Sequence, residues 1–456
     1  MATGLIIPGV QVTVVKEVLP QQLAPSGVLG ITGFTEQNTG KVVRAGSWSR
    51  FVEVMGRASA YSLPEARQAL DNGVSELVIS PLPVGAGTAA SISIAGDASR
   101  FPSGATGEKA GITLTARAPG PWANGLTARV EYRNNIDKSV SFDLEITHPA
   151  SGASEVFRNV GSASLASSLE GSSFVKVDAS KAVGWPTAGT YTLTGGKDAT
   201  ADEYATALGR LRNEPDVDLV VAAVQDFSDR AKVTRIYGDV ISHCNNLSGD
   251  SKGRLGLGQV PTSGTVEEHS QLASNLVSDR FVLVAPNGVV GAVAGLVGSL
   301  APHQSPTFKR VSGVGEPTLT VEEQKGLLRG NVVPVVVERG RGTIVVRGLT
   351  TDGDQINVRR VADRAVRTLK MVGDLFIGLL NNADGRSALK QKLVEALVQM
   401  QKDGAIVPST DGKDPAFKVE VYSSQQDFAL GVVRVNMAVR PVRAIDYIYA
   451  TITVQV

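Results

Sequence analysis

The sequence predicts a mixed α/β protein with three parts. A mostly parallel sheet with helices on both faces is expected for residues 23–84 and 198–330, where short apolar runs alternate with helical patterns. Residues 85–197 are rich in Gly, Ser, Ala and Thr and hold short alternating runs, which indicates an inserted all-β domain. Residues 331–440 combine a hairpin, long amphipathic helices and strands, so a C-terminal α+β domain is expected, with extended arms at 1–22 and 441–456.

The core pattern is a regular succession of buried strands and amphipathic helices. In the helix expected at 229–247, Val233, Ile236, Tyr237 and Cys244 share one face, which places Cys244 in the core and the adjacent His243 at its margin. The other expected core strands lie at 28–34, 76–80, 217–224, 254–260 and 280–285, and the other helices at 47–55, 63–72, 266–277 and 288–300.

The two remaining parts have their own patterns. Strands of the inserted domain are expected at 112–116, 126–132, 140–147 and 191–194. In the C-terminal part we expect a hairpin of 332–338 and 343–347, helices at 356–380 and 387–404, and strands at 417–422, 432–440 and 445–456. Ser387 is the expected N-cap of the second helix, whose core face is Leu389, Leu393, Leu397 and Met400.

Both ends of the chain alternate between apolar and polar residues with a period of two. The set that points to strand pairing is Ile6, Val10, Val12, Val14, Tyr447, Ile448, Tyr449, Ile452 and Val454. An unpaired strand exposes backbone groups that recruit another chain. The two ends therefore predict either strand exchange between copies of the chain or completion of its own sheet.

Composition excludes several functional classes. With 45 Lys and Arg against 44 Asp and Glu, the formal charge is +1, which gives no sign of a nucleic-acid surface. The single cysteine and four scattered histidines predict neither a disulfide framework nor a metal site. No basic segment followed by an apolar one begins the sequence, and the apolar run 288–300 is too short to span a bilayer.

Motifs for catalysis or cofactor binding are incomplete. Gly288, Gly291 and Gly295 lack the Lys and hydroxyl of a phosphate loop and instead indicate close helix packing. The stretch Asp352-Gly353-Asp354 lacks the ligand spacing of a calcium loop and predicts a polar turn. No G-x-S-x-G elbow occurs. We therefore expect a structural or assembly protein without a cofactor rather than an enzyme.

Ordered motifs along most of the chain resemble the sheath proteins of contractile phage tails and of phage-derived injection machines. They include Pro8-Gly9-Val10-Gln11-Val12, Gly27-Val28-Leu29-Gly30, Pro121-Trp122-Ala123-Asn124-Gly125-Leu126, Leu193-Thr194-Gly195-Gly196-Lys197-Asp198, Ser305-Pro306-Thr307-Phe308-Lys309 and Val346-Arg347-Gly348-Leu349-Thr350-Thr351. The resemblance implies a core of subtilisin-like shape without that activity. It also implies terminal arms that add strands to the C-terminal sheets of neighbouring subunits.

The resemblance further implies a function. A sheath subunit polymerises into hexameric rings around an inner tube, contacts baseplate and terminator or cap proteins, and contracts to drive the tube through an envelope. Residues 16–26, 427–431 and 441–443 would be its hinges, and Lys390, Lys392 and Lys402 would face the tube. The particle would be a phage tail assembled in the host cytoplasm, or a cytoplasmic or extracellular injection system. Two alternatives stay open, a non-contractile tube component and an α/β-hydrolase-like enzyme.

Overall fold

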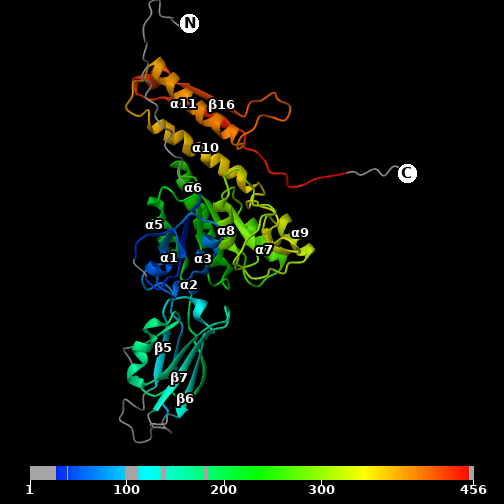
Figure 1. The fold of residues 1–456 in the computed structure, drawn as a ribbon. Coiled ribbons are helices and arrows are strands. Elements are labelled where there is room, and N and C mark those ends of the chain that lie inside the picture. Colours follow the sequence, from blue (N-terminus) through cyan, green and yellow to red (C-terminus); the bar gives the residue numbers. More distant parts are fainter. Residues whose placement is uncertain (1–26, 38–39, 98–110, 135–139, 179–182, 451–456) are drawn as a thin grey trace, which may run out of the picture.

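The computed structural model describes residues 27–37, 40–97, 111–134, 140–178 and 183–450. The molecule is elongated, with a β domain at one end, an α/β layer in the middle and a helical C-terminal domain at the other end (Figure 1). The expected mixed α/β fold with several sheets is confirmed. Of the residues expected to pair as strands, Ile6, Val10, Val12, Val14, Ile452 and Val454 lie outside the described part.

The central sheet contains eight strands within the described residues, in the order β15-β14-β13-β12-β11-β1-β3-β2. The strands from β14 to β3 run parallel, and β15 and β2 pair antiparallel at the two edges. Apolar residues fill both faces because helices cover both. The strands are β1 Val28–Gly33, β2 Val43–Ala45, β3 Glu76–Pro81, β11 Leu219–Ala222, β12 Leu255–Gln259, β13 Phe281–Ala285, β14 Val333–Glu338 and β15 Gly342–Val345.

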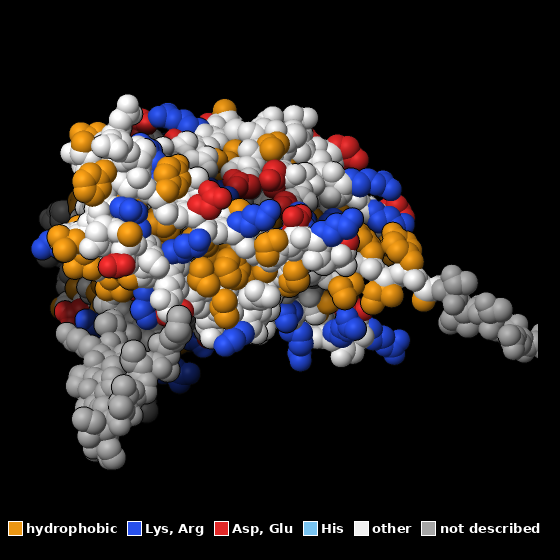
Figure 2. Space-filling model, turned by 90° about the horizontal axis from the view of Figure 1, so that it is seen from above, with side chains coloured by type: hydrophobic (Ala, Val, Ile, Leu, Met, Phe, Trp, Pro, Cys, Tyr) orange, Lys and Arg blue, Asp and Glu red, His pale blue; other side chains and the backbone are white. Residues whose placement is uncertain are grey.

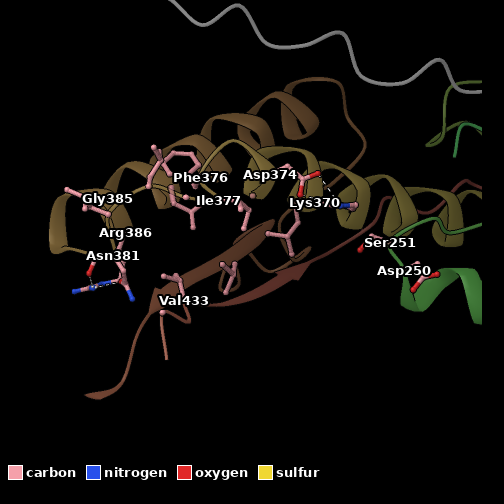
Figure 3. A pocket seen from close by; sticks show the side chains of 18 of the residues that line it. Asp250, Ser251, Lys370, Asp374, Phe376, Ile377, Asn381, Gly385, Arg386 and Val433 are labelled. Carbon is pink, nitrogen blue, oxygen red and sulfur yellow. Dashed lines mark hydrogen bonds and ion pairs between the residues drawn. The ribbon is translucent and has the colours of Figure 1, made fainter. Parts of the chain in front are cut away.

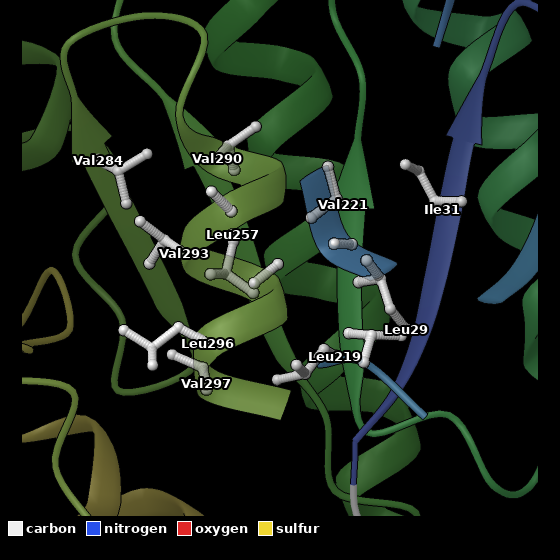
Figure 4. Packing of buried hydrophobic residues seen from close by; sticks show 14 of the residues in the cluster. Leu29, Ile31, Leu219, Val221, Leu257, Val284, Val290, Val293, Leu296 and Val297 are labelled. Carbon is white, nitrogen blue, oxygen red and sulfur yellow. The ribbon is translucent and has the colours of Figure 1, made fainter. Parts of the chain in front are cut away.

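Two helix layers enclose this sheet. Along β1, Leu29 and Ile31 face the layer of α1, α3 and α8, whereas Val28 faces the layer of α5, α6, α7 and α9. Figure 4 shows Val293 and Leu296 of α8 in the first of these two cores. The helices are α1 Trp48–Met55, α2 Ser59–Ser62, α3 Pro64–Asp71, α5 Ala201–Arg210, α6 Arg230–Gly249, α7 Val266–Ser274, α8 Val290–Ser299 and α9 Val321–Arg329.

Glycines let α8 approach α3 at backbone distance. A Cβ at Gly291 would lie 2.5 Å from the carbonyl oxygen of Glu65, and a Cβ at Gly295 would lie 2.5 Å from that of Ala69. Such distances exclude any side chain. The interpretation of this glycine-rich stretch as a packing surface is confirmed.

The inserted β domain consists of two small antiparallel sheets around one apolar core. Gln225 joins it to the central layer: its Oε1 accepts from the Trp122 backbone N–H at 3.0 Å, and its Nε2 donates to Ser62 O at 2.7 Å. The elements are β4 Ser91–Ile94, β5 Ile112–Ala116, β6 Thr127–Asn134, β7 Val140–His148, β8 Ala153–Val160, α4 Leu165–Ser168, β9 Val175–Val177 and β10 Gly189–Thr192. Single turns of 3-10 helix occur at Pro121–Ala123, Ser162–Ser164, Leu169–Gly171 and Leu211–Asn213.

The C-terminal domain contains α10 Ile356–Asp374, α11 Ala383–Lys402, β16 Phe417–Tyr422, α12 Gln425–Ala429 and β17 Arg434–Val439. Two expected helix boundaries are wrong. The helix expected to reach 380 ends at Asp374, and Leu379, which lies within the expected span, is 62% exposed. The next helix starts before Ser387, because Asn382 caps it by accepting from the Gly385 backbone N–H at 2.7 Å.

Two further elements differ from the expectation. Helix α9 falls in a stretch for which no helix was expected, although Thr320 and Glu323 form a capping box at its start. Residues 445–450 are described but belong to no strand, so this part of the expected terminal strand is not formed within the single chain. A strand requires a backbone hydrogen-bonding partner, and within the described chain no strand pairs with these residues.

Candidate assembly interface

The C-terminal domain is built from two long helices that pack on a narrow sheet. Strands β16 and β17 pair antiparallel in an unbroken register, from Phe417 opposite Val439 to Tyr422 opposite Arg434. Their inward residues, Val419, Val421, Val435 and Met437, join the core formed with α10 and α11. The outward residues of the same strands are exposed. The alternation follows from the strand geometry, which points successive side chains to opposite faces.

This sheet is too narrow to cover its helices. Among the described residues it has two strands, and an isolated two-stranded sheet is marginally stable. Both outer edges therefore carry backbone groups without a strand partner in the described chain. The inward residues of β17 stay partly exposed for the same reason.

A groove of about 580 Å³ lies beside β17, between the C-terminal half of α10 and the start of α11. Its apolar lining includes Leu369, Phe376, Leu389, Val433 and Val435. Figure 3 shows Phe376 and Ile377 on one side of the groove and Val433 on the other. An additional strand along β17 would cover these residues.

Exposed apolar residues surround the groove at the end of the domain. Ile377 is 81% exposed, Leu380 80% and Leu430 78%. The first two belong to the α10–α11 connection and the third to the turn before β17. Asn381 Nδ2 links the two segments by donating to Val432 O at 3.4 Å and to Ser423 Oγ at 3.2 Å, and Ser423 Oγ donates to Val432 O at 2.8 Å. Figure 2 looks down on this end of the molecule and shows apolar side chains grouped among charged ones. Contiguous exposed apolar surface of this kind marks interaction sites.

The C-terminal segment is fastened at its start and exposed beyond it. The Val442 backbone N–H donates to Ala405 O at 3.0 Å. Asp446 Oδ2 accepts hydrogen bonds from Arg347 Nε at 2.9 Å and from Gln355 Nε2 at 2.7 Å. The side chains beyond Asp446 are exposed, from Tyr447 at 63% to Ile448 at 84% and Tyr449 at 94%. Figure 1 shows this segment leaving the body of the molecule.

The expected hinges at 427–431 and 441–443 are held in place in this structure. Asp427 lies in α12, and its carboxylate accepts from Arg434 Nη2 at 2.8 Å. The Arg434 guanidinium lowers the pKa of Asp427 to about 2. In the second segment, Asn357 Nδ2 donates to Val442 O at 3.0 Å and Arg443 Nη1 donates to Asp354 Oδ1 at 2.7 Å.

Arginines of α10 fix the C-terminal domain to the central layer. Arg367 Nη2 donates to Gly253 O at 2.6 Å, and Arg360 Nη1 donates to Leu300 O at 3.1 Å. Burial lowers the pKa of Arg360. Both acceptors are backbone carbonyls next to the ends of core elements, so the orientation of α10 is set by the core.

The core face expected for the second helix is confirmed, since Leu389, Leu393, Leu397 and Met400 are buried in α11. Lys390, Lys392 and Lys402 are exposed on the same helix. Lys392 Nζ pairs with Glu395 Oε2 at 2.8 Å. An exposed pair of this kind contributes little stability, so Lys392 stays available to an acidic partner.

The adjacent His243 and Cys244 side chains of α6 both lie in the core. Cys244 is buried, as expected, but His243 is also buried, at 6% exposed, so its expected place at the margin is wrong. Its Nε2 accepts from Arg254 Nη1 at 2.8 Å. Burial and then the Arg254 charge lower the pKa of His243 to about 3, which leaves the ring neutral at physiological pH.

The described residues contain no group of three or more His, Cys, Asp or Glu side chains placed to hold a metal ion. Asp352 caps the polar turn expected there, since its Oδ1 accepts from Thr350 Oγ1 at 2.6 Å and from the Asp354 N–H at 3.2 Å. No helix among these residues has the length and apolar character needed to cross a bilayer.

Residues 350–455, which span α10, α11, the β16–β17 sheet and the exposed segment, match the family model described as phage tail sheath C-terminal domain. This region is therefore similar to a phage tail sheath C-terminal domain. The matched region thus contains most of the groove lining and nearly the whole of the C-terminal arm. No curated protein sequence matches the chain.

Solved sheath structures share the fold of the whole chain. The sheath tail protein of Listeria innocua is 17% identical, with 92% of each chain covered and a TM-score of 0.53. The contracted helical sheath of the anti-feeding prophage is 14% identical, with 98% of this chain and 99% of that chain covered and a TM-score of 0.55. The contracted sheath of an extracellular contractile injection system, PVC, is 14% identical over 99% and 98% of the two chains, with a TM-score of 0.54. At these identities the likeness establishes the fold.

Sequence reasoning did not single out the residues that line the groove and hold the arm. Phe376 lines the groove, and Arg347 and Gln355 bind Asp446, but sequence reasoning assigned none of the three such a role. One signal was present, because Asp446 is a single charge within the otherwise uncharged stretch 444–456. A lone carboxylate in an alternating strand pattern indicates a local partner.

Proposed function

We propose that this chain is a structural subunit of a contractile sheath and that it polymerises by exchanging strands with its neighbours. The observation that carries the proposal is a mismatch within the C-terminal domain. A two-stranded sheet with open edges stands beside an apolar groove. An alternating segment of the same chain begins at Tyr447 and, within the described residues, has no strand partner. The open sheet edge and its groove lack a covering strand, and the arm lacks a sheet to pair with.

The C-terminal arm has the pattern that the groove requires. In an added strand, Ile448, Ala450, Ile452 and Val454 would share one face at period two and cover the apolar groove. Tyr447 and Tyr449 would lie on the opposite face. Each backbone hydrogen bond gained contributes roughly 0.5–1.5 kcal/mol, and the buried apolar face adds to this. Pairing across several residues therefore gives a fastening between subunits that does not depend on side-chain contacts elsewhere.

The N-terminal arm supplies a second strand in this proposal. The sheet has two edges, and the alternating residues Ile6, Val10, Val12 and Val14 form a matching apolar face. With one arm on each edge, every subunit would be joined to two neighbours. A heterologous contact of this kind generates rings or helices. Hexameric rings stacked as a helix around an inner tube belong to this proposal.

Contraction requires that subunits change their mutual contacts without separating. An exchanged strand resists separation because several hydrogen bonds would have to break together. The exposed lysines of α11, Lys390, Lys392 and Lys402, are the proposed contacts to an acidic surface of the inner tube. Baseplate and cap proteins would bind the open arms and edges at the two ends of the array. The sheath would contract to drive the tube through an envelope, in a phage tail or an injection particle.

Deletion of residues 447–456 tests the proposal. We expect the truncated chain to stay folded and monomeric, whereas the full chain forms hollow cylinders visible by electron microscopy. The matched control is the double substitution Thr451→Ser and Thr453→Ser, which keeps the arm and its apolar face. Normal cylinders from the truncated chain would overturn the proposal.

A further inference from the structure

We propose that the contacts of Asp446 with Arg347 and Gln355 direct the C-terminal arm away from its own sheet, so that it pairs with another subunit. These three residues are called the Asp446 clamp. They act as positioning residues for the arm. The inference rests on the proposed strand exchange. It adds that the clamp decides whether the arm pairs within its own subunit or with a neighbouring subunit.

The clamp grips both the backbone and a side chain of the arm. Gln355 Oε1 accepts from the Ala444 N–H at 2.8 Å, and Gln355 Nε2 donates to Ala444 O at 3.0 Å. The amide thus pairs with Ala444 as a neighbouring strand would. Asp446 Oδ2 receives charge-assisted bonds from the same Nε2 and from Arg347. The register of the arm is fixed over three residues.

Within the described residues, hydrogen bonding between the arm and the parent chain ends at Asp446. The Asp446 side chain is 7% exposed, whereas its neighbours Ile445 and Tyr447 are 79% and 63% exposed. The guanidinium of Arg347 lies 5.4 Å from the Tyr447 ring centroid, which orients the first residue beyond the clamp. The arm therefore leaves the parent at a defined point and in a defined direction.

Without the clamp, the parent's own groove would compete for the arm. The clamp is at the start of α10 and the groove at its other end, about 30 Å away for a helix of this length. Residues 447–456 extended as a strand reach about 33 Å, so a released arm is long enough to reach its own groove. A tethered strand has an effective concentration on the order of millimolar, which exceeds the concentration of free subunits. The clamp removes this advantage because it holds the arm in another direction.

The test is Asp446→Ala, measured in two ways. We expect the protein concentration needed for assembly to rise roughly tenfold, because the arm of each subunit now occupies its own groove. We also expect the outer-edge amides of β17, those that point away from β16, to be protected from hydrogen exchange in the dilute variant. In the dilute unchanged protein they should exchange freely and become protected on assembly. A clamp that merely stabilised the tail would not give protection in the dilute variant.

Controls separate the possible outcomes. Asp414→Ala removes an equal charge in the same domain by breaking the exposed Arg440 pair and should change neither measurement. Arg347→Gln is a second route to release should Asp446→Ala fail to fold, as judged by circular dichroism. Unchanged assembly, or weaker assembly with the outer-edge amides of β17 still unprotected in dilute solution, would overturn the clamp while leaving strand exchange intact. Failure of the unchanged protein to assemble would instead overturn the proposed function and the clamp with it.

Discussion

The carboxylate of Asp363 in α10 accepts hydrogen bonds from both terminal nitrogens of Arg280, at 2.9 Å and 2.8 Å. The pair is buried between the C-terminal domain and the start of β13. Arg359 adds a third bond to the same carboxylate at 2.8 Å. A Cβ at Gly253 would lie 2.4 Å from the Asp363 carboxyl carbon, so the site has no spare room. This network fastens the C-terminal domain to the central layer.

Loss of Asp363 should destabilise the protein strongly. In Asp363→Ala, Arg280 keeps a buried charge without its partner, and the expected cost is about 3–5 kcal/mol of unfolding free energy. Chemical denaturation measures it. The control Glu53→Ala breaks the exposed pair with Arg50 and should cost less than about 1 kcal/mol. Equal effects of the two substitutions would show that the Arg280–Asp363 pair does not hold the domains together.

The contact between α3 and α8 should tolerate no added methyl group. Gly295→Ala places a Cβ against the Ala69 backbone, and we expect it to cost about 1–3 kcal/mol in thermal or chemical unfolding. Gly238→Ala in α6 is the matched control, because no atom lies within 4 Å of its Cβ position. It should stabilise by up to about 1 kcal/mol through helix propensity. The prediction fails if both substitutions change the unfolding free energy in the same direction.

Glu65 should make stability depend on pH. Burial raises its pKa to about 7 from 4.5, so the folded state binds the proton more tightly than the unfolded chain. Stability therefore falls as pH rises through this interval. In Glu65→Gln this part of the dependence is lost. We expect its stability relative to the unchanged protein to increase by roughly 3 kcal/mol between about pH 4 and pH 8.

Denaturation at several pH values checks this, with Glu53→Gln as the control at an exposed carboxylate, 68% exposed. For the control, the difference in unfolding free energy from the unchanged protein should stay constant with pH. A constant difference for Glu65→Gln would mean that Glu65 titrates normally in the folded protein.

The two faces of β17 should differ in their effect on assembly. Val435 lines the groove, whereas Asn436, the next residue, is exposed on the opposite face. A lysine at 435 puts a charge where the incoming strand would bury its apolar residues. We expect Val435→Lys to raise the concentration needed for assembly about tenfold or more, and Asn436→Lys to leave it nearly unchanged. Sedimentation of polymers measures both, after the monomers are shown to be equally folded. Equal assembly of the two variants would place the pairing surface elsewhere.

Local sequence patterns correctly predicted the elements whose buried faces follow from the spacing of their own apolar residues. The strands at β1, β3 and β13 follow from short β-branched runs, and the buried face of α11 follows from its helical spacing. Errors occurred where a distant residue decides the outcome. His243 is buried because Arg254, the residue before β12, lies against it and donates to its ring. Helix α10 ends early, and the exposed connection that follows has apolar residues that no pattern distinguishes from a buried face.

The sequence by itself determined the mixed α/β class, the period-two arms and the lack of a complete catalytic motif, because these depend on the order of residue types along the chain. Only the tertiary structure decided that the β16–β17 sheet leaves a groove open, that α10 is tied to the core by Arg280 and that Asp446 is gripped by Arg347 and Gln355. These features join residues far apart in the sequence. Their contribution comes from burial and from hydrogen bonds made in the folded chain, which no local pattern encodes.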